Sequence, residues 1–224
     1  HRGQIRGRAG SVAIDGAGRV WVAGTSDGAL LVWRYDDPRF YRREGASAAG
    51  IAVDGSYVHV VANTSAGMLL LRLDLEGHFV SEIGWSGGSA SGMAVSGGAV
   101  YVAATDGADA VLFKDAEEFR RRPGSGAAVA ADASGDLHFA GSSAGDAFVE
   151  RLSPDGALVD VQTFDSGFQD SASGIALAVD GVYLAGTMAS AIGRDIFVTR
   201  LGSWVATHDS GFDDTAAAVA LDST

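Results

Sequence analysis

The chain has 224 residues, no cysteine and 32 glycines, and its 28 acidic and 16 basic side chains give a formal net charge of −12. The lack of cysteine excludes disulfide scaffolds, thiolate zinc sites and thiol nucleophiles, and the negative charge argues against non-specific nucleic-acid binding. Hydrophobic residues make up 47% of the chain, which excludes general disorder. No apolar run reaches the roughly 18 residues of a membrane span.

One short apolar phrase with a central alanine recurs six times along the chain. It first reads Ser11-Val12-Ala13-Ile14-Asp15 and returns at intervals of about 41 residues, the period of four-stranded propeller blades. Each copy is followed by an Asp- and Gly-rich turn, a second apolar strand, a third strand and an outer strand. The only helix-like stretch, residues 115–122, is too short to challenge an all-β fold. We therefore predict a β-propeller of four-stranded blades, with five full repeats and a partial sixth.

The repeats predict one β-propeller domain over residues 1–224. We expect blades at about residues 10–45, 46–88, 89–124, 125–170 and 171–214, followed by a partial blade at 215–224. Only the first strand of the sixth repeat, residues 216–221, is predicted, and residues 4–8 offer at most one outer strand. Either the ring closes with an incomplete blade or the chain is a fragment of a longer propeller, and we favour the fragment.

Three phrases of the fifth repeat carry a family resemblance: Ser173-Gly174-Ile175-Ala176, the strand from Val182 to Thr187, and the strand from Arg194 to Leu201. They resemble the bacterial β-propeller family of SBBP repeats, with NHL and delta-60 repeats as weaker relatives. The resemblance covers nearly the whole chain, although the third repeat has Ala104 where the family has glycine. It implies a bacterial protein that is extracellular, periplasmic or at the cell surface, and it implies no shared chemistry.

The most distinctive polar motif is a loop that occurs twice. It reads Asp165-Ser166-Gly167-Phe168-Gln169-Asp170 before the fifth repeat and Asp209-Ser210-Gly211-Phe212-Asp213-Asp214 before the sixth, and a Gly-rich loop around Trp85 takes the same place before the third. Such loops join an outer strand to the next inner strand, so we expect them on the propeller face that commonly holds ligands. The candidate binding residues are Trp85, Asp165, Phe168, Asp170, Asp209, Phe212, Asp213 and Asp214.

Two interpretations of these loops stay open. Their carboxylates at Asp170, Asp213 and Asp214 could bind calcium, which takes oxygen ligands, or the Asp, Ser and Gly residues could simply form turns, which we favour. The aromatic rings could stack on sugars or pack beneath the loops. No cofactor other than calcium is expected.

Other polar residues recur at fixed repeat positions. His59 and His138 take the place of Trp21, Tyr101 and Tyr183, which favours rings packed between blades over metal ligands. One basic residue in each third strand could bind an anion, but a solvated strand face with carboxylate partners is the favoured interpretation; these residues are Arg34, Arg72, Lys114, Arg151 and Arg200. The arginines at positions 39, 42, 43 and 120–122 could protect the outer strand edges from pairing with other sheets, or they could dock an acidic partner.

No nucleophile elbow, catalytic triad motif or phosphate loop is present, so no catalytic residue is assigned. We predict a non-catalytic binding or scaffold module of an exported or surface-associated bacterial protein that engages a protein or glycan partner. One alternative is a lyase or hydrolase acting on a polysaccharide or a small molecule at the axial face. Another is a structural subunit of a larger assembly.

Overall fold

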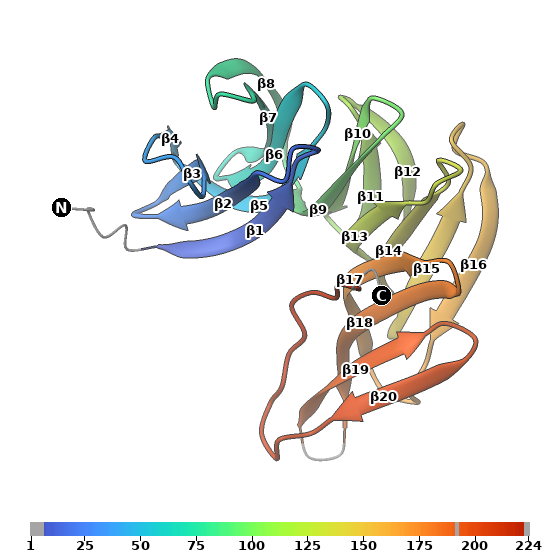
Figure 1. Ribbon diagram of the computed structural model, residues 1–224. Coiled ribbons are helices and arrows are strands. Elements are labelled where there is room, and N and C mark those ends of the chain that lie inside the picture. Colours follow the sequence, from blue (N-terminus) through green and yellow to red (C-terminus); the bar gives the residue numbers. More distant parts are fainter. Residues whose placement is uncertain (1–6, 191–192, 222–224) are drawn as a thin grey trace. The chain divides into compact units, whose positions relative to one another are not determined.

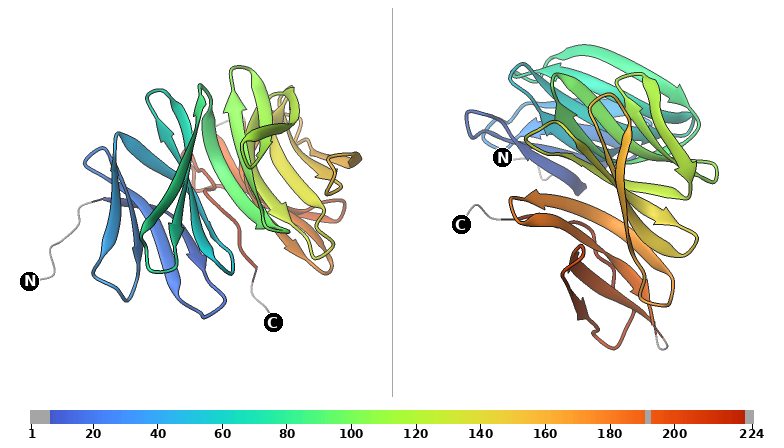
Figure 2. Two further views of the ribbon diagram at one scale, coloured as in Figure 1. Left: turned by 90° about the horizontal axis from the view of Figure 1, so that it is seen from above. Right: turned by 90° about the vertical axis from the view of Figure 1, so that its right-hand side faces the viewer.

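The computed structural model describes residues 7–190 and 193–221. In these residues it contains β-strands and turns and no helix. Five antiparallel sheets follow one another along the chain, each made of four consecutive strands that lie side by side (Figures 1 and 2). The predictions of an all-β fold and of four strands per repeat are confirmed, whereas ring closure and the total number of blades stay predictions.

The strand bounds follow the repeat. The first sheet contains β1 (Arg8–Ile14), β2 (Val20–Ser26), β3 (Ala29–Arg34) and β4 (Phe40–Glu44). The second contains β5 (Ala46–Val53), β6 (Tyr57–Thr64), β7 (Gly67–Asp74) and β8 (Phe79–Ser86). The third contains β9 (Ser89–Ser96), β10 (Ala99–Asp106), β11 (Asp109–Lys114) and β12 (Glu117–Pro123). The fourth contains β13 (Ser125–Ala131), β14 (Leu137–Ser143), β15 (Asp146–Leu152) and β16 (Leu158–Phe164). The fifth contains β17 (Asp170–Ala178), β18 (Gly181–Ala189), β19 (Arg194–Arg200) and β20 (Trp204–His208).

The chain divides into two compact units, residues 1–102 with 114–116, and residues 103–113 with 117–224. In the first unit, apolar side chains of the first two sheets form a common core that includes Leu30, Val60 and Leu71. In the second unit, Val149 and Phe197 join the fourth and fifth sheets in the same way. These cores form because period-2 alternation turns one row of each strand towards the neighbouring sheet.

A hydrogen bond of one kind, here called the inter-repeat hydrogen bond, follows every sheet. A side-chain oxygen near the end of the second strand accepts the backbone N–H of the first residues of the next repeat. The acceptor and donor pairs are Thr25 with Ala48 (3.0 Å), Asn63 with Ala90 (2.7 Å), Thr105 with Gly126 (3.1 Å), Ser142 with Ala172 (3.1 Å) and Thr187 with Ala216 (3.3 Å). The polar residue at this position therefore has a structural role in each repeat.

Residues 216–221 were predicted to form a strand, and this prediction is wrong. They receive the inter-repeat hydrogen bond and lie close to β17, where a Cβ on Gly174 would be 3.0 Å from Ala218 Cα. No strand of the described residues pairs with their backbone, so they lack the ladder that defines a strand. The helix-like residues 115–122 form a turn and most of β12. Of the predicted strand at 4–8, residues 4–6 lie outside the described residues and Arg8 begins β1.

Candidate functional site

A cleft of about 360 Å³ opens where the connection after β12 meets loops and strand ends of the fourth and fifth sheets within the second unit. Its wall comes from the start of β13, the turn before β15, the loop before β17, and the facing ends of β18 and β19. The residues that line it are mostly small or hydroxyl-bearing: Gly124, Ser125, Ser142, Ser143, Ala144, Gly145, Gln169, Asp170, Ser171, Thr187, Ala189 and Arg194. A cavity of this size can enclose a small ligand.

Some polar groups of the cleft are already used by the fold. Ser142 and Thr187 accept inter-repeat hydrogen bonds, and the Ser171 hydroxyl donates to the carbonyl of Thr187. Among the described residues, four other lining side chains have no hydrogen-bond partner: Ser125, Ser143, Gln169 and Arg194. These hydroxyl, amide and guanidinium groups can therefore bind a ligand without breaking a contact of the fold.

The loop at 165–170 holds a buried carboxylate at the edge of this cleft. Asp170 is 3% exposed, and its two oxygens accept the Ser166 N–H and hydroxyl, both at 2.8 Å. Asp165 accepts the Gly167 N–H at 2.7 Å, which tightens the turn. Phe168 is 55% exposed, so its ring stands free of the core. The ring of Phe168 is therefore exposed while the carboxylate of Asp170 is buried within the loop, and the role of this loop as a binding site stays a prediction.

The loop at 209–214 repeats this geometry. Asp214 accepts the Ser210 N–H (2.8 Å) and hydroxyl (2.9 Å), and these bonds hold the pKa of Asp214 below its ordinary value. Asp209 accepts the Gly211 N–H at 2.6 Å, and Phe212 is 81% exposed. Asp213 bonds outside the loop, because its Oδ1 accepts the backbone N–H of Arg194 in β19 at 3.1 Å.

The predicted calcium ligands Asp170, Asp213 and Asp214 do not form one group. The carboxylates gather instead in two clusters whose ligand atoms lie within 4.8 Å of one another, Asp146 with Asp165 and Asp170, and Asp195 with Asp209 and Asp214. Each cluster combines two loop residues with an aspartate at the start of a third strand. Sequence reasoning missed Asp146 and Asp195, although both occupy the same repeat position just before the apolar core of that strand.

Trp85 was predicted to lie in a loop, and this placement is wrong, whereas its role in binding stays a prediction. Trp85 lies in β8 opposite Met68 of β7, is half-buried, and donates its indole N–H to the Ala116 carbonyl at 3.2 Å. The turn comes later, at Gly87 and Gly88, whose φ angles are +78° and +71°. The glycines on either side of Trp85 suggested a loop, but an edge strand tolerates Gly84.

The recurring aromatic or histidine of the second strand bonds to the turn before it. In the first repeat the Trp21 indole N–H donates to Asp15 at 3.3 Å, and in the fifth the Tyr183 hydroxyl donates to Asp180 at 3.0 Å. In the second and fourth repeats the rings are His59, which is 1% exposed and 2.8 Å from Asp54, and His138, 3.4 Å from Asp132. The interpretation of the histidines as packed structural rings agrees with this geometry.

These turn carboxylates have shifted acidities. Burial alone would raise the pKa of Asp15, but hydrogen bonds from Arg19, Trp21 and Ala17 outweigh burial and lower the pKa to about 2. A hydrogen bond from the Ser134 hydroxyl, with others from His138 and backbone N–H groups, lowers the pKa of Asp132 to about 2. Both carboxylates are therefore ionised anchors of their turns and poor candidates for proton transfer near neutral pH.

The basic residues of the third strands are paired within the fold. Arg34, Arg151 and Arg200 form ion pairs with carboxylates of nearby turns, while Arg72 and Lys114 lie over the rings of Tyr57 and Tyr101. The denser arginine patches are neutralised as well, through pairs of Arg39 with Asp37, Arg42 with Glu44, Arg43 with Glu82, Arg120 and Arg122 with Glu150, and Arg121 with Asp106, Asp109 and Glu118. These pairings favour the structural interpretation of both groups over an anion-binding ring.

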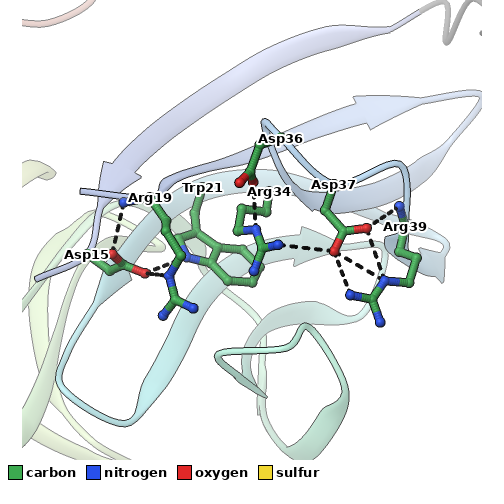
Figure 3. Close-up of polar contacts among 7 residues, drawn as sticks. All are labelled: Asp15, Arg19, Trp21, Arg34, Asp36, Asp37 and Arg39. Atoms are coloured by element: carbon green, nitrogen blue, oxygen red, sulfur yellow. Dashed lines mark hydrogen bonds and ion pairs between the residues drawn. The ribbon is translucent and has the colours of Figure 1, made fainter. Parts of the chain in front are cut away.

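A second cavity, of about 260 Å³, lies in the first unit beside Trp21, Trp33 and Tyr41. Figure 3 shows that three of its polar side chains are bonded to one another: Asp37 accepts hydrogen bonds from both Arg34 (3.3 Å) and Arg39 (2.6 Å). The two guanidinium groups hold the pKa of Asp37 far below its ordinary value, with Arg39 as the larger cause. A ligand there would have to break these bonds, so the cleft of the second unit is the stronger candidate site.

No protein-family model matches the chain, and no curated protein sequence matches it. Several solved structures are similar. A catalytically inactive variant of virginiamycin B lyase from Staphylococcus aureus, solved with quinupristin, has a TM-score of 0.66 and 11% identity over 92% of this chain and 71% of that chain. A streptogramin B lyase has a TM-score of 0.61 and 14% identity over 90% of this chain and 68% of that one.

A third similar structure is the extracellular domain of a one-component system from B. thetaiotaomicron. Its TM-score is 0.56 at 15% identity, and the match covers 96% of this chain but only 31% of that chain. At such identities the likeness shows the fold alone, which is that of β-propeller proteins. The resemblance to SBBP repeats stays a prediction.

Proposed function

We propose that this chain is a binding module of a β-propeller protein and that its ligand is a glycan held in the cleft of the second unit. The observation that carries the proposal is the cleft's lining, in which the side chains of Ser125, Ser143, Gln169 and Arg194 have no partner among the described residues. Sugars present dense hydroxyl groups, which such donors and acceptors match. Phe168, which precedes Gln169 in the sequence but does not line the cleft, has an exposed ring of the kind that stacks on sugar rings.

The proposal extends to an extracellular, periplasmic or cell-surface place in a bacterium. One similar structure is an extracellular domain, and the resemblance to SBBP repeats points the same way. Among the described residues no helix is long and apolar enough to cross a membrane. A scaffold within a larger assembly is compatible with the same cleft.

The alternative proposal is a lyase or hydrolase, since two of the similar structures are lyases. An enzyme would need a general acid or base in the cleft. Among the described lining residues there is no histidine, and the buried Asp170 has both oxygens bonded to Ser166. This lining favours binding over catalysis.

The test is a glycan array followed by calorimetric titration of any glycan that binds. We expect R194A and Q169A each to weaken binding about tenfold, the loss of roughly one hydrogen bond to a charged or polar group. R151A is the matched control, because Arg151 pairs with Asp136 and does not line the cleft. Absence of glycan binding by the folded protein would refute the proposal, and turnover of a bound glycan would favour the enzyme.

A further inference from the structure

Three carboxylates meet at the end of the fifth sheet. Asp195 follows the first residue of β19, and Asp209 and Asp214 bracket the loop after β20. One oxygen of each lies within 4.8 Å of the others. The loop is pre-shaped, because Asp214 and Asp209 are fixed by bonds from Ser210 and Gly211.

A second observation comes from Asp195 itself. Its side chain is only 7% exposed, and its Oδ1 is buried with no hydrogen-bond donor. A buried carboxylate oxygen without a partner is costly. It is also rare in a folded protein. A bound cation would supply the missing partner.

No ion pair neutralises this cluster among the described residues, although the charge of His208 helps to lower the pKa of Asp214. Among the described residues, none of Asp195, Asp209 and Asp214 forms an ion pair with Lys, Arg or His. In the third repeat the equivalent aspartate does have a basic partner: Asp109, at the same strand position as Asp195, forms an ion pair with Arg121 at 2.9 Å. Close like charges repel one another, so a bound cation would stabilise a carboxylate cluster that has no arginine partner.

We infer that Asp195, Asp209 and Asp214 bind one calcium ion. The donor set is all oxygen, which suits a hard cation and not zinc, whose usual ligands are sulfur and nitrogen. Three carboxylates supply about three to six of the roughly six to eight oxygens that calcium takes, and loop carbonyls and water supply the rest. Magnesium, which demands near-octahedral geometry, should bind more weakly. This inference does not depend on the glycan proposal.

The related cluster of Asp146, Asp165 and Asp170 serves as an internal comparison. It has the same loop geometry, since both oxygens of Asp170 accept bonds from Ser166 as those of Asp214 do from Ser210. The counterpart of Asp195 is Asp146, which has no buried oxygen left without a partner among the described residues. Asp146 is half-buried rather than buried. The calcium site is therefore assigned to the Asp195 cluster alone.

The experiment is calorimetric titration of the chelator-treated chain with calcium chloride, and separately with magnesium chloride. We expect one calcium per chain, with a Kd no weaker than about 1 mM, as in extracellular calcium modules, and a raised thermal midpoint in calcium. D195N and D209N should each weaken binding at least tenfold, whereas D146N should bind like the wild type. D209N alters an exposed residue, so it decides the matter if D195N fails to fold.

Three results would overturn the inference. The first is no binding heat at about 10 mM calcium, well above the range of known modules. The second is calcium binding that is as tight in D209N as in the wild type, and equally tight in D195N if that variant folds. The third is loss of the ion in D146N. Magnesium bound as tightly as calcium would overturn the choice of ion.

Discussion

Replacing Thr105 by valine tests the inter-repeat hydrogen bond. The Thr105 hydroxyl accepts the Gly126 N–H at 3.1 Å and lies 3.5 Å from the Gly126 carbonyl, while Gly126 itself is buried. Valine keeps the volume and β-branched shape of threonine but removes the oxygen. The buried N–H of Gly126 then has no acceptor, which costs about 1–3 kcal/mol. For a chain of this size that is a fall in Tm of roughly 2–12 °C.

Urea unfolding and amide hydrogen exchange measure the effect together. We expect T105V to have a lower urea midpoint than the wild type. We also expect hydrogen exchange to accelerate more at the Gly126 amide than at the other amides of β13. The matched control is T163V, since Thr163 is an exposed residue of β16 with no hydrogen bond from its side chain among the described residues; its change should stay within about 0.5 kcal/mol. An unchanged midpoint with unchanged Gly126 exchange in T105V would refute the structural role of this position.

E150Q should lower the free energy of unfolding, measured in urea titrations, by about 2 kcal/mol. This is less than the roughly 3–5 kcal/mol lost when a fully buried ion pair is broken, because the arginines bonded to the buried Glu150 reach solvent. An effect under about 0.5 kcal/mol would contradict this prediction. The pKa of Asp132 falls from 3.8 to about 2 on folding, so its stabilising effect is full above pH 3.8 and is lost as the pH falls through about 2. The difference in urea midpoint between wild type and D132N should therefore shrink as the pH is lowered from 3.8 to about 2. A constant difference over this range would refute the lowered pKa of Asp132. G186A should destabilise by about 1–3 kcal/mol through overpacking, since a Cβ there would lie 2.1 Å from the Ser171 carbonyl oxygen; thermal melts should show no comparable loss in G16A, where nothing lies within 4 Å.

Local chemistry explains why the strands were predictable. The turn at Asp15 and Gly18, for example, was visible as an Asp-Gly signal, and in the structure Gly18 has φ of +78° and donates its N–H to the Asp15 carbonyl. Alternating apolar residues on either side of such turns then define hairpins within a few residues. Each four-stranded sheet is built from contacts between consecutive strands, so the repeat in the sequence gives the sheet directly.

The candidate site was less predictable because it depends on distant contacts. The loop carboxylates were evident as a motif, but their partners Asp146 and Asp195 come from the preceding third strands. Which end of a strand faces a loop depends on sheet register, which the sequence does not state. Similarly, Gln169 and Arg194 line one cleft only because the β16–β17 loop meets the start of β19.

Comparison between repeats separates structural polar residues from candidate functional ones. The inter-repeat acceptor is Thr, Asn, Thr, Ser and Thr in successive repeats, so its chemistry is retained and its role is structural. The Asp-Ser-Gly-Phe loop occurs in only two repeats, and an unpaired buried oxygen is found at Asp195 and not at the arginine-paired Asp109. A fold built of equivalent sheets does not require such differences. The unpartnered oxygen of Asp195 and the 209–214 loop beside it are differences of this kind, and they are where we propose a ligand-dependent role.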